Sequence, residues 1–239
     1  MKRIPLLEEL YIIDIEGEWD ANSKDNIEFF KTFSVPETLQ RYGIVLGSEN
    51  FSPYYYFFLN KDFHIHGRTL LLNHFDISNV VIKGLAKKAK HLFVGNIDGG
   101  AKNMIPDIFE IEGGGLNELN MLDIRDSAEM KCLIDTPSHS SELVTLFSKL
   151  HTLKLERMEN LKAICHCFLP ANGSFGNLEN LDLSDCPRLT LLFTYAVARN
   201  LVKLKILEIS SCDELKHIFE EGKHPYFYSP SIPTTTVNF

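Results

Sequence analysis

Two clusters of cysteine and histidine contain the residue types that bind zinc. Cys165, His166 and Cys167 are consecutive, and His64 and His66 are separated by one residue. A structural zinc ion needs four such ligands, which usually come as two closely spaced pairs. In an extended segment Cys165 and His166 would point to opposite faces, and no second pair follows at zinc-site spacing. We therefore predict that the chain binds no metal and no other cofactor.

Motifs for nucleophilic catalysis and phosphate binding are missing from the sequence. It contains no Gly-x-x-x-x-Gly-Lys-Ser/Thr loop, no Gly-x-Ser-x-Gly turn and no His-Glu-x-x-His pair. The glycine run 113–115 is predicted to be a flexible connection, because no lysine-containing helix start follows it. Acid–base catalysis needs carboxylates in a closed pocket, and the sequence indicates none. The chain is therefore predicted not to be an enzyme; a hydrolase built on the same scaffold would require such a pocket.

The composition describes a folded protein with an acidic balance. Of 239 residues, 44% are hydrophobic and 23% are charged, which allows a sizeable core. The net charge of −8 argues against binding of nucleic acid through its phosphate backbone. No apolar run is long enough to span a membrane, and Glu8 and Glu9 interrupt the N-terminal apolar stretch, so we predict no secretory signal. An odd number of cysteines (5) fits a reducing compartment, and we expect a cytoplasmic protein.

An internal repeat is the strongest pattern in the sequence. Seven apolar or cysteine positions recur at an offset of 26 residues: Leu178, Leu181, Leu183, Cys186, Leu189, Leu192 and Phe193 match Leu204, Leu207, Ile209, Cys212, Leu215, Ile218 and Phe219. The same frame continues upstream with growing irregularity. Eight positions are taken as equivalent, at a mean spacing of about 28 residues: Leu10, Tyr42, Leu70, Leu92, Leu122, Leu153, Leu181 and Leu207.

The spacing within each repeat predicts a stack of coils around a shared core. The Leu-x-Leu step is a period of two, so both leucines of a short strand point inward and the residue between them points outward. One coil cannot bury its apolar face alone, whereas stacked coils bury one another's. Residues 195–202 are predicted to be helical, and the other returning segments to be irregular or short turns. Cys186 and Cys212 are predicted to turn inward and donate weak hydrogen bonds to carbonyl groups of the loops.

The outward positions of the strands form the candidate binding surface. They are the residue between the two leucines of a repeat and its neighbours, namely Phe93, Asp123, Arg125, Lys154, Glu156, Arg157, Asp182, Asp185 and Glu208. They carry both signs of charge, and this mix favours a protein partner over nucleic acid. The aromatic run 54–59 lies outside the repeat frame, and we expect it to pack onto the core or to form an exposed apolar patch.

The repeats resemble those of a known family. Residues 177–189, 196–204 and 212–218 look like the leucine-rich repeats of plant intracellular immune receptors, the disease-resistance proteins that combine a coiled coil, a nucleotide-binding domain and leucine-rich repeats. The resemblance implies an α/β solenoid, a leucine-rich-repeat horseshoe of about eight irregular repeats with a parallel concave sheet. It extends over residues 1–222, irregular in 1–84 and regular in 85–222. Residues 223–239 are predicted to form a poorly ordered tail.

The resemblance also implies a function. Such a region recognises a pathogen effector or a host protein that the effector modifies, and helps to hold the nucleotide-binding domain inactive. The implied partner is therefore the effector, the guarded host protein or the nucleotide-binding domain. This sequence contains neither that domain nor the coiled coil, so we expect a fragment of a receptor. The alternatives are a leucine-rich-repeat substrate adaptor of a ubiquitin ligase, which also uses cysteine-containing repeats, and a free-standing scaffold protein.

Overall fold

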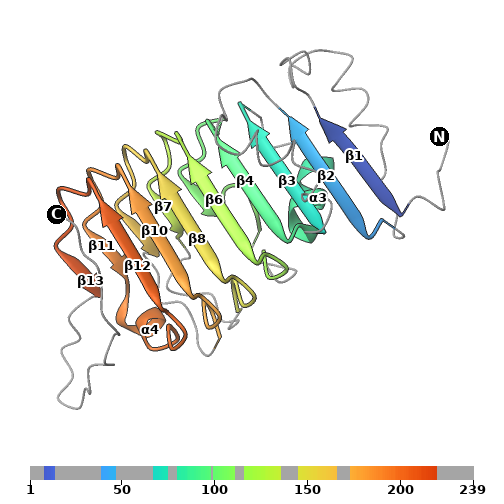
Figure 1. Cartoon of the computed structure of the whole chain (residues 1–239). Helices are drawn as coiled ribbons and strands as arrows, with labels where there is room; N and C mark the ends of the chain where they lie inside the picture. Colours follow the sequence, from blue (N-terminus) through green and yellow to red (C-terminus); the bar gives the residue numbers. More distant parts are fainter. Residues whose placement is uncertain are drawn as a thin grey trace. The chain divides into compact units, whose positions relative to one another are not determined.

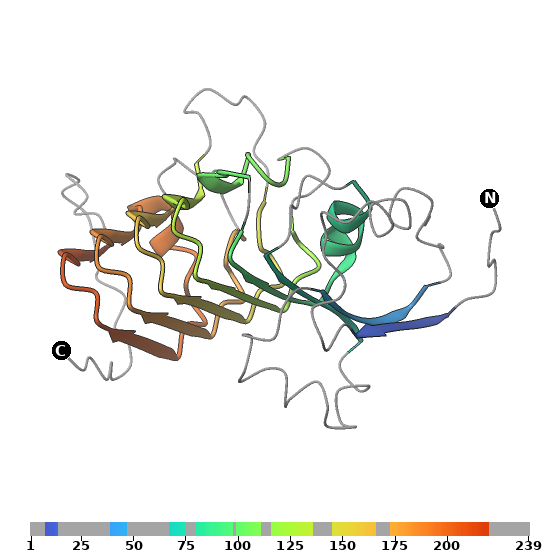
Figure 2. The ribbon, with the colours of Figure 1, turned by 90° about the horizontal axis from the view of Figure 1, so that it is seen from above.

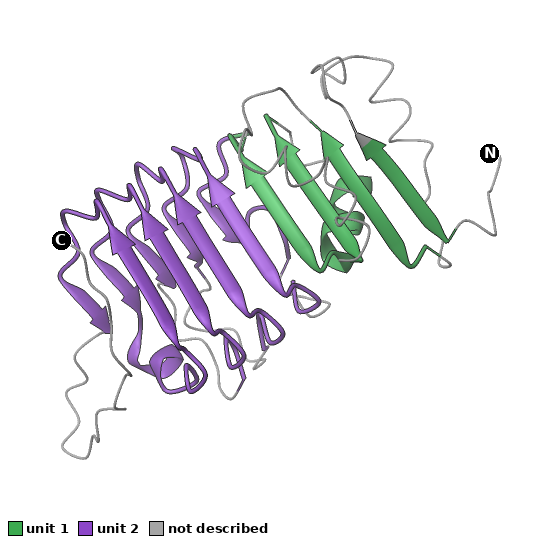
Figure 3. Cartoon of the chain, viewed as in Figure 1, with its two compact units in different colours: residues 1–99 green, residues 100–239 purple. Residues whose placement is uncertain are grey.

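The chain has two compact units in its computed structural model. The structure describes residues 8–13, 39–46, 67–74, 80–97, 99–110, 116–135, 145–165 and 173–219. They fall into unit 1, residues 1–99, and unit 2, residues 100–239 (Figure 3). The aromatic run 54–59, the glycine run 113–115 and the tail 223–239 lie outside the described residues, so the predictions for them stay predictions.

The described residues of unit 1 include four parallel strands that pair in chain order. They are β1 (Glu9–Ile13), β2 (Arg41–Leu46), β3 (Arg68–Asn73) and β4 (His91–Gly95) (Figure 1). Ile44 lies opposite both Ile12 and Leu70, whereas Tyr42 lies opposite Arg68. The prediction that Leu10 and Tyr42 are equivalent to Leu70 is therefore wrong. The residue of β2 opposite Leu70 is Ile44, two positions after Tyr42. The match of Leu10 with Tyr42 is confirmed. The apolar side chains of β2 and β3 run almost continuously, so alternation could not fix the register between these two strands.

A helix that the sequence analysis missed lies between β3 and β4. α3 (Val80–Lys88) buries Ile82, Leu85 and Ala86, which are spaced to share one helix face. The hydroxyl of Tyr42 donates a hydrogen bond to the Leu85 carbonyl, and burial raises the pKa of Tyr42. The prediction of an irregular return is therefore wrong for residues 80–88.

Unit 2 is a parallel solenoid with two sheets. Its long strands pair in the order β6 (Met121–Arg125), β8 (Thr152–Glu156), β10 (Asn180–Ser184) and β12 (Ile206–Ser210). The second sheet consists of the short strands β5 (Asn103–Ile105), β7 (Cys132–Ile134), β9 (Ala163–Cys165), β11 (Leu191–Phe193) and β13 (His217–Phe219). Figure 2 shows the successive coils stacked side by side. The parallel, stacked-coil architecture is confirmed; the number of repeats and the horseshoe shape stay predictions.

The leucines of the long strands point into the core, as predicted. The first leucine positions Leu122, Leu153, Leu181 and Leu207 lie opposite one another in register. Leu122 and Leu153 are fully buried, and Leu207 is 4% exposed. Identical apolar rows on neighbouring coils therefore bury each other, which explains why the repeat frame is strict in this unit.

Each long strand of unit 2 is followed directly by a residue with left-handed backbone geometry. These residues are Asp126, Arg157, Asp185 and Ser211, with φ between 50° and 52°. The amide of Asp126 donates to the Glu156 carbonyl of the next coil at 3.1 Å, and Arg157 repeats this contact to Ser184 at 3.0 Å. The turn therefore redirects the chain toward the short strand while it continues the hydrogen bonding between coils.

Three phenylalanines stack through successive coils of unit 2. Phe147 and Phe175 precede β8 and β10, and their ring centroids are 5.3 Å apart. Phe175 also meets Phe193 of β11, at 5.7 Å. All three are buried. Because such aromatic pairs add to the stabilisation from burial alone, this stack is a main contact between coils.

The helix predicted in residues 195–202 is present in shorter form. α4 spans Tyr195–Ala198 and buries Val197. Among the helices that the structure describes, none has the length and apolarity needed to cross a bilayer.

Candidate functional site

The long strands of unit 2 present a row of charged side chains. Asp123, Lys154, Asp182 and Glu208 occupy the position between the two core leucines, and each lies opposite the next in register. Neighbouring strands in a sheet are about 4.8 Å apart, so these charges stand close together along the face. The sequence order along the row is negative, positive, negative, negative. We call these residues the central row.

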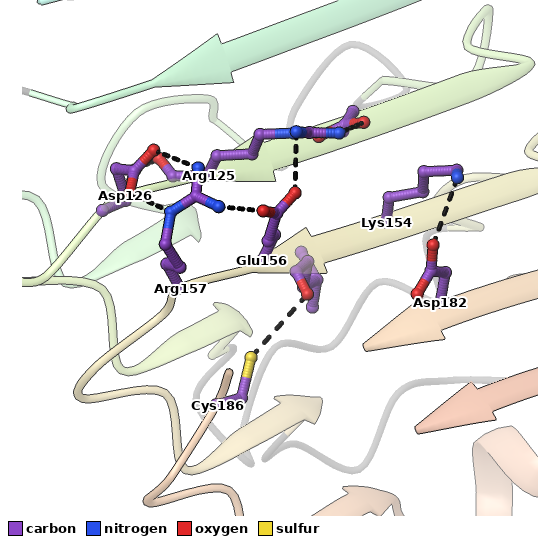
Figure 4. Close-up of polar contacts among 10 residues, drawn as sticks. Arg125, Asp126, Lys154, Glu156, Arg157, Asp182 and Cys186 are labelled. Carbon is purple, nitrogen blue, oxygen red and sulfur yellow. Dashed lines mark hydrogen bonds and ion pairs between the residues drawn. The ribbon is translucent and has the colours of Figure 1, made fainter. Parts of the chain in front are cut away.

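An ion-pair network joins β6 and β8 at the carboxyl ends of the strands (Figure 4). Arg125 donates to Asp123 through Nε at 2.8 Å and through Nη2 at 3.1 Å, and its Nη1 lies 2.7 Å from Glu156. Arg157 contacts the same Glu156 and forms two hydrogen bonds to Asp126, at 2.6 and 2.9 Å. The hydrogen bonds to Asp126 raise the pKa of Arg157 further above its usual range. These two arginines and three carboxylates are therefore engaged with one another within the protein.

The charge balance differs at the other end of the face. Lys154 pairs with Asp182 at 3.1 Å, and both side chains are about one-third exposed. Glu208 and Asp185 are exposed and take part in no ion pair with any residue that the structure describes. The surface over β10 and β12 therefore carries the excess negative charge of this face.

Two residues predicted to face outward are buried. Phe93 is 3% exposed and Asp123 is 0% exposed. Phe93 belongs to β4, whose residues 92–95 are all buried, so the alternation rule fails where both faces of a strand are covered. Arg125 supplies two hydrogen bonds to Asp123, which compensates for burial of the carboxylate.

The other predicted residues are accessible to differing degrees. Glu208, Arg157 and Asp185 are exposed, whereas Arg125, Lys154, Glu156, Asp182 are partly exposed. The structure brings together the positions of β6 to β12, and Phe93 lies in unit 1. Whether any of them contacts a partner stays a prediction.

The inward orientation predicted for Cys186 and Cys212 is found. Cys186 is buried, and its thiol donates to the Ser184 carbonyl at 3.4 Å and to the Leu155 carbonyl at 3.8 Å. Cys212 donates to the Ser210 carbonyl at 3.4 Å and is only partly buried. Ser127 occupies the equivalent position and donates to the Arg125 carbonyl at 2.9 Å. The position therefore anchors the turns that follow β6, β10 and β12.

The two thiols should differ in reactivity. Interaction with the Cys186 thiol lowers the pKa of Cys212, and the same interaction together with burial raises the pKa of Cys186. Cys212 should therefore react with iodoacetamide with a pH midpoint below the value of about 8.5 for a free thiol. Cys186→Ala should move that midpoint upward, as followed by mass spectrometry of the Cys212 peptide. An unmoved midpoint would mean that the thiols do not interact.

No metal cluster is found in the part of the chain that the structure describes. No three His, Cys, Asp or Glu side chains there are placed to hold an ion. Cys165 ends β9 and is buried, whereas His64, His66, His166 and Cys167 lie outside the described residues. The side chains over β6 to β12 form a charged surface whose groups can make ion pairs and hydrogen bonds.

Comparison with known proteins identifies the repeat type. The family model for plant disease resistance protein RPS2-like leucine-rich repeats matches residues 76–213. No curated protein and no solved structure matches the chain. The matched stretch is more than half of the 239 residues, and it contains all four long strands of unit 2. Solenoids of this kind typically serve as interaction scaffolds, because stacked coils present an extended surface. The chain therefore belongs to the leucine-rich-repeat family of plant disease resistance proteins.

Proposed function

We propose that the chain is the protein-recognition region of a plant intracellular immune receptor. It binds a pathogen effector or a host protein that the effector modifies, and it does so through the strand face of unit 2. The single observation that carries this proposal is the central row, in which charged side chains stand in register on neighbouring strands. Charged side chains held in fixed positions on a sheet can select a partner whose surface carries the complementary charges. Such complementarity affects the specificity and the association rate of binding.

The distribution of charge on the face indicates where recognition is centred. Arg125, Glu156 and Arg157 are already engaged with one another, so a partner would gain little by competing for them. Asp182 shares one lysine, and Glu208 has no cation among the described residues. Charge complementarity therefore favours contact of basic groups with Asp182 and Glu208.

In the full receptor the same region would contribute to autoinhibition. The proposed contact is between the solenoid and the nucleotide-binding domain in the cytoplasm, with about eight repeats forming a horseshoe. An effector that competes for this contact would release the nucleotide-binding domain. It would bind the released state more tightly than the autoinhibited state, and a ligand shifts an equilibrium toward the state that it binds more tightly.

A leucine-rich-repeat substrate adaptor or free-standing scaffold is the second candidate. The observation that favours it is the cysteine at the turn position of two repeats spaced by 26 residues. An adaptor should copurify with components of a ubiquitin ligase, whereas a receptor region should copurify with an effector, a host target or a nucleotide-binding domain.

Charge reversal on the face tests the proposal. Asp182→Lys with Glu208→Lys should reduce recovery of specific partners from leaf extract by at least about tenfold, since several charge contacts of about 1 kcal/mol each would become repulsive. The matched control is Asp213→Lys with Glu214→Lys, which changes the same residue types at exposed positions outside the strand face. Quantitative mass spectrometry of the recovered proteins gives the readout. Equal recovery with both double variants would refute recognition through this face.

A further inference from the structure

Two cysteines stand at equivalent positions on neighbouring coils of unit 2. Cys186 follows β10 and Cys212 follows β12, each two residues after the serine that ends its strand. These serines, Ser184 and Ser210, lie opposite each other in register. Each thiol donates to the carbonyl of its own serine at 3.4 Å, so the two side chains point the same way. The two sulfur atoms therefore lie side by side across the boundary between the coils.

The backbone holds the two coils together on both sides of this cysteine pair. Before it, the amide of Asp185 donates to the Ser210 carbonyl at 3.1 Å. After it, the amide of Glu214 donates to the Pro187 carbonyl at 3.2 Å. Neighbouring chains that are hydrogen-bonded in this way are about 4.8 Å apart. A disulfide needs Cα atoms that are about 4.4 to 6.8 Å apart, so the two cysteines are within reach of each other.

The other two described cysteines are placed differently. Cys165 of β9 lies opposite Ile134, whereas Cys132 of β7 lies opposite Ala163. With this offset of two residues, the rise along a strand and the spacing between strands put their Cα atoms roughly 8 Å apart. Cysteines more than about 7 Å apart cannot be bridged without movement of the backbone. Cys132 and Cys165 are therefore not positioned to form a disulfide with each other.

The turns after the long strands do not need a thiol for their structure. Ser127 occupies the equivalent position after β6 and donates to the Arg125 carbonyl at 2.9 Å. Met158 occupies it after β8 and is fully buried. A hydroxyl or a thioether therefore suffices at this position, whereas two adjacent thiols can also form a covalent bond between coils. The turns after β10 and β12 carry this additional chemistry.

The two thiols differ in how readily they form a thiolate, which is the species that reacts with oxidants. Interaction with the Cys186 thiol lowers the pKa of Cys212 and outweighs its partial burial, which acts in the opposite direction. The same interaction and burial raise the pKa of Cys186. Cys212 is also the less buried of the two. Cys212 is therefore the sulfur that an oxidant attacks first, and Cys186 is the thiol that then reacts with the product.

We propose that Cys186 and Cys212 form a peroxide-sensitive modification site, at which hydrogen peroxide converts two thiols into a disulfide between neighbouring coils. The Cys212 thiolate attacks one oxygen of the peroxide, so that an S–O bond forms, the O–O bond breaks and hydroxide leaves. The Cys186 thiol then attacks the sulfur of this sulfenic acid. The S–S bond forms, the S–O bond breaks, and the departing hydroxide takes the Cys186 proton as water. Each sulfur loses one electron, and the peroxide is reduced to water.

The disulfide would link residues that are 26 positions apart in the sequence. Such a link restricts the unfolded chain and thereby stabilises the folded solenoid. In a reducing compartment the bond would be transient and would report the presence of oxidant. The inference is independent of the proposed function, since it concerns a contact between coils and not a partner.

Peroxide treatment of the full chain tests the proposal. The reduced protein is treated with hydrogen peroxide at neutral pH, catalase removes the excess, and free thiols are blocked with iodoacetamide in denaturant. Mass spectrometry of the tryptic peptides should find the peptides of Cys186 and Cys212 cross-linked in most molecules. Dithiothreitol should release the link. Cys165, which is buried in β9, should be recovered as the alkylated thiol.

A variant of the second thiol separates the two steps of the reaction. Cys186→Ser keeps a donor of the kind that Ser127 provides in its own turn. In this variant Cys212 should accumulate as a sulfenic acid that dimedone traps. The matched control is Cys165→Ala, which removes a buried cysteine outside the pair and should leave the cross-link unchanged. Peroxide should raise the melting temperature of the original protein by about 5 °C or more, and that of Cys186→Ser should not rise.

Several outcomes would overturn the proposal. They are recovery of both cysteines as free thiols after peroxide, a link from Cys212 to another cysteine or to a second chain, and a link between Cys186 and Cys212 that forms only in denaturant. A sulfenic acid that persists on Cys212 in the original protein would also refute it. Because the cross-link is mapped in the original protein, this result decides the matter even if Cys186→Ser does not fold.

Discussion

Replacing Phe175 by alanine is expected to lower the free energy of unfolding by about 4 kcal/mol. The ring contacts both Phe147 of the preceding coil and Phe193 and is fully buried, so its removal breaks both aromatic contacts. Alanine keeps the Cβ atom at this left-handed position (φ 56°), so the change in backbone strain is small and the effect reports packing. Urea denaturation followed by circular dichroism measures it.

Val202 provides the matched control for this prediction. It is 80% exposed, and Val202→Ala should change the free energy of unfolding by less than about 0.5 kcal/mol. A loss below about 1 kcal/mol for Phe175→Ala would contradict a solenoid in which contacts between coils carry the stability.

Arg125→Ala is expected to have the second largest effect on stability and to lower the free energy of unfolding by about 3 kcal/mol. Arg125 is 12% exposed and Asp123 is 0% exposed, so the substitution removes both guanidinium hydrogen bonds from a buried carboxylate. Arg125→Met retains much of the aliphatic stem and should still destabilise the protein, because the charge and the donors are lost. Chemical denaturation at low and high salt gives the values.

The exposed pair of Lys149 and Glu118 serves for comparison. Their side chains are 56% and 44% exposed, and Lys149→Ala should cost less than about 1 kcal/mol. The loss for Arg125→Ala should persist in high salt, since a buried pair is poorly screened. Equal losses for the two variants would show that the network at β6 and β8 is only a surface feature.

The long strands of unit 2 could be predicted because their alternation is complete. In β8 and β10 the leucines are buried and the residues between and beside them are partly exposed, which is the period that the sequence displays. The turn cysteines were predictable for the same reason, since they follow the second leucine at a constant distance. In β2 and β3 the apolar residues are nearly continuous, and the predicted register between these two strands was wrong, whereas the predicted match of Leu10 in β1 with Tyr42 in β2 was right.

The second sheet was missed because its strands are too short to show a period. β7 and β9 have three residues each, and all of them are buried. A short apolar run carries no information about strand or turn. The phenylalanine stack had a signal that was overlooked, since Leu116, Phe147, Phe175 and Leu201 all stand three residues before a core leucine. The sequence also contained a signal for α3, namely the helical spacing of Ile82, Leu85 and Ala86.

The candidate site was predictable in position but not in its electrostatics. Alternation placed Lys154, Asp182 and Glu208 on the strand face, yet it also placed Asp123 there, where the structure buries it. The left-handed turn at Arg157 and the two hydrogen bonds of Arg157 to Asp126 of the preceding coil depend on how coils stack. Sequence spacing within one repeat does not contain that information.

Carboxylate footprinting of the chain with a copurified partner tests the central claim most directly. Carbodiimide labelling of Asp182 and Glu208 should fall several-fold when the partner is bound, because their contact with it excludes the reagent. Asp213 and Glu214, which are exposed outside the strand face, should label equally in the free and bound states. Protection of Asp213 and Glu214 with unchanged labelling of Asp182 and Glu208 would contradict recognition through the strand face.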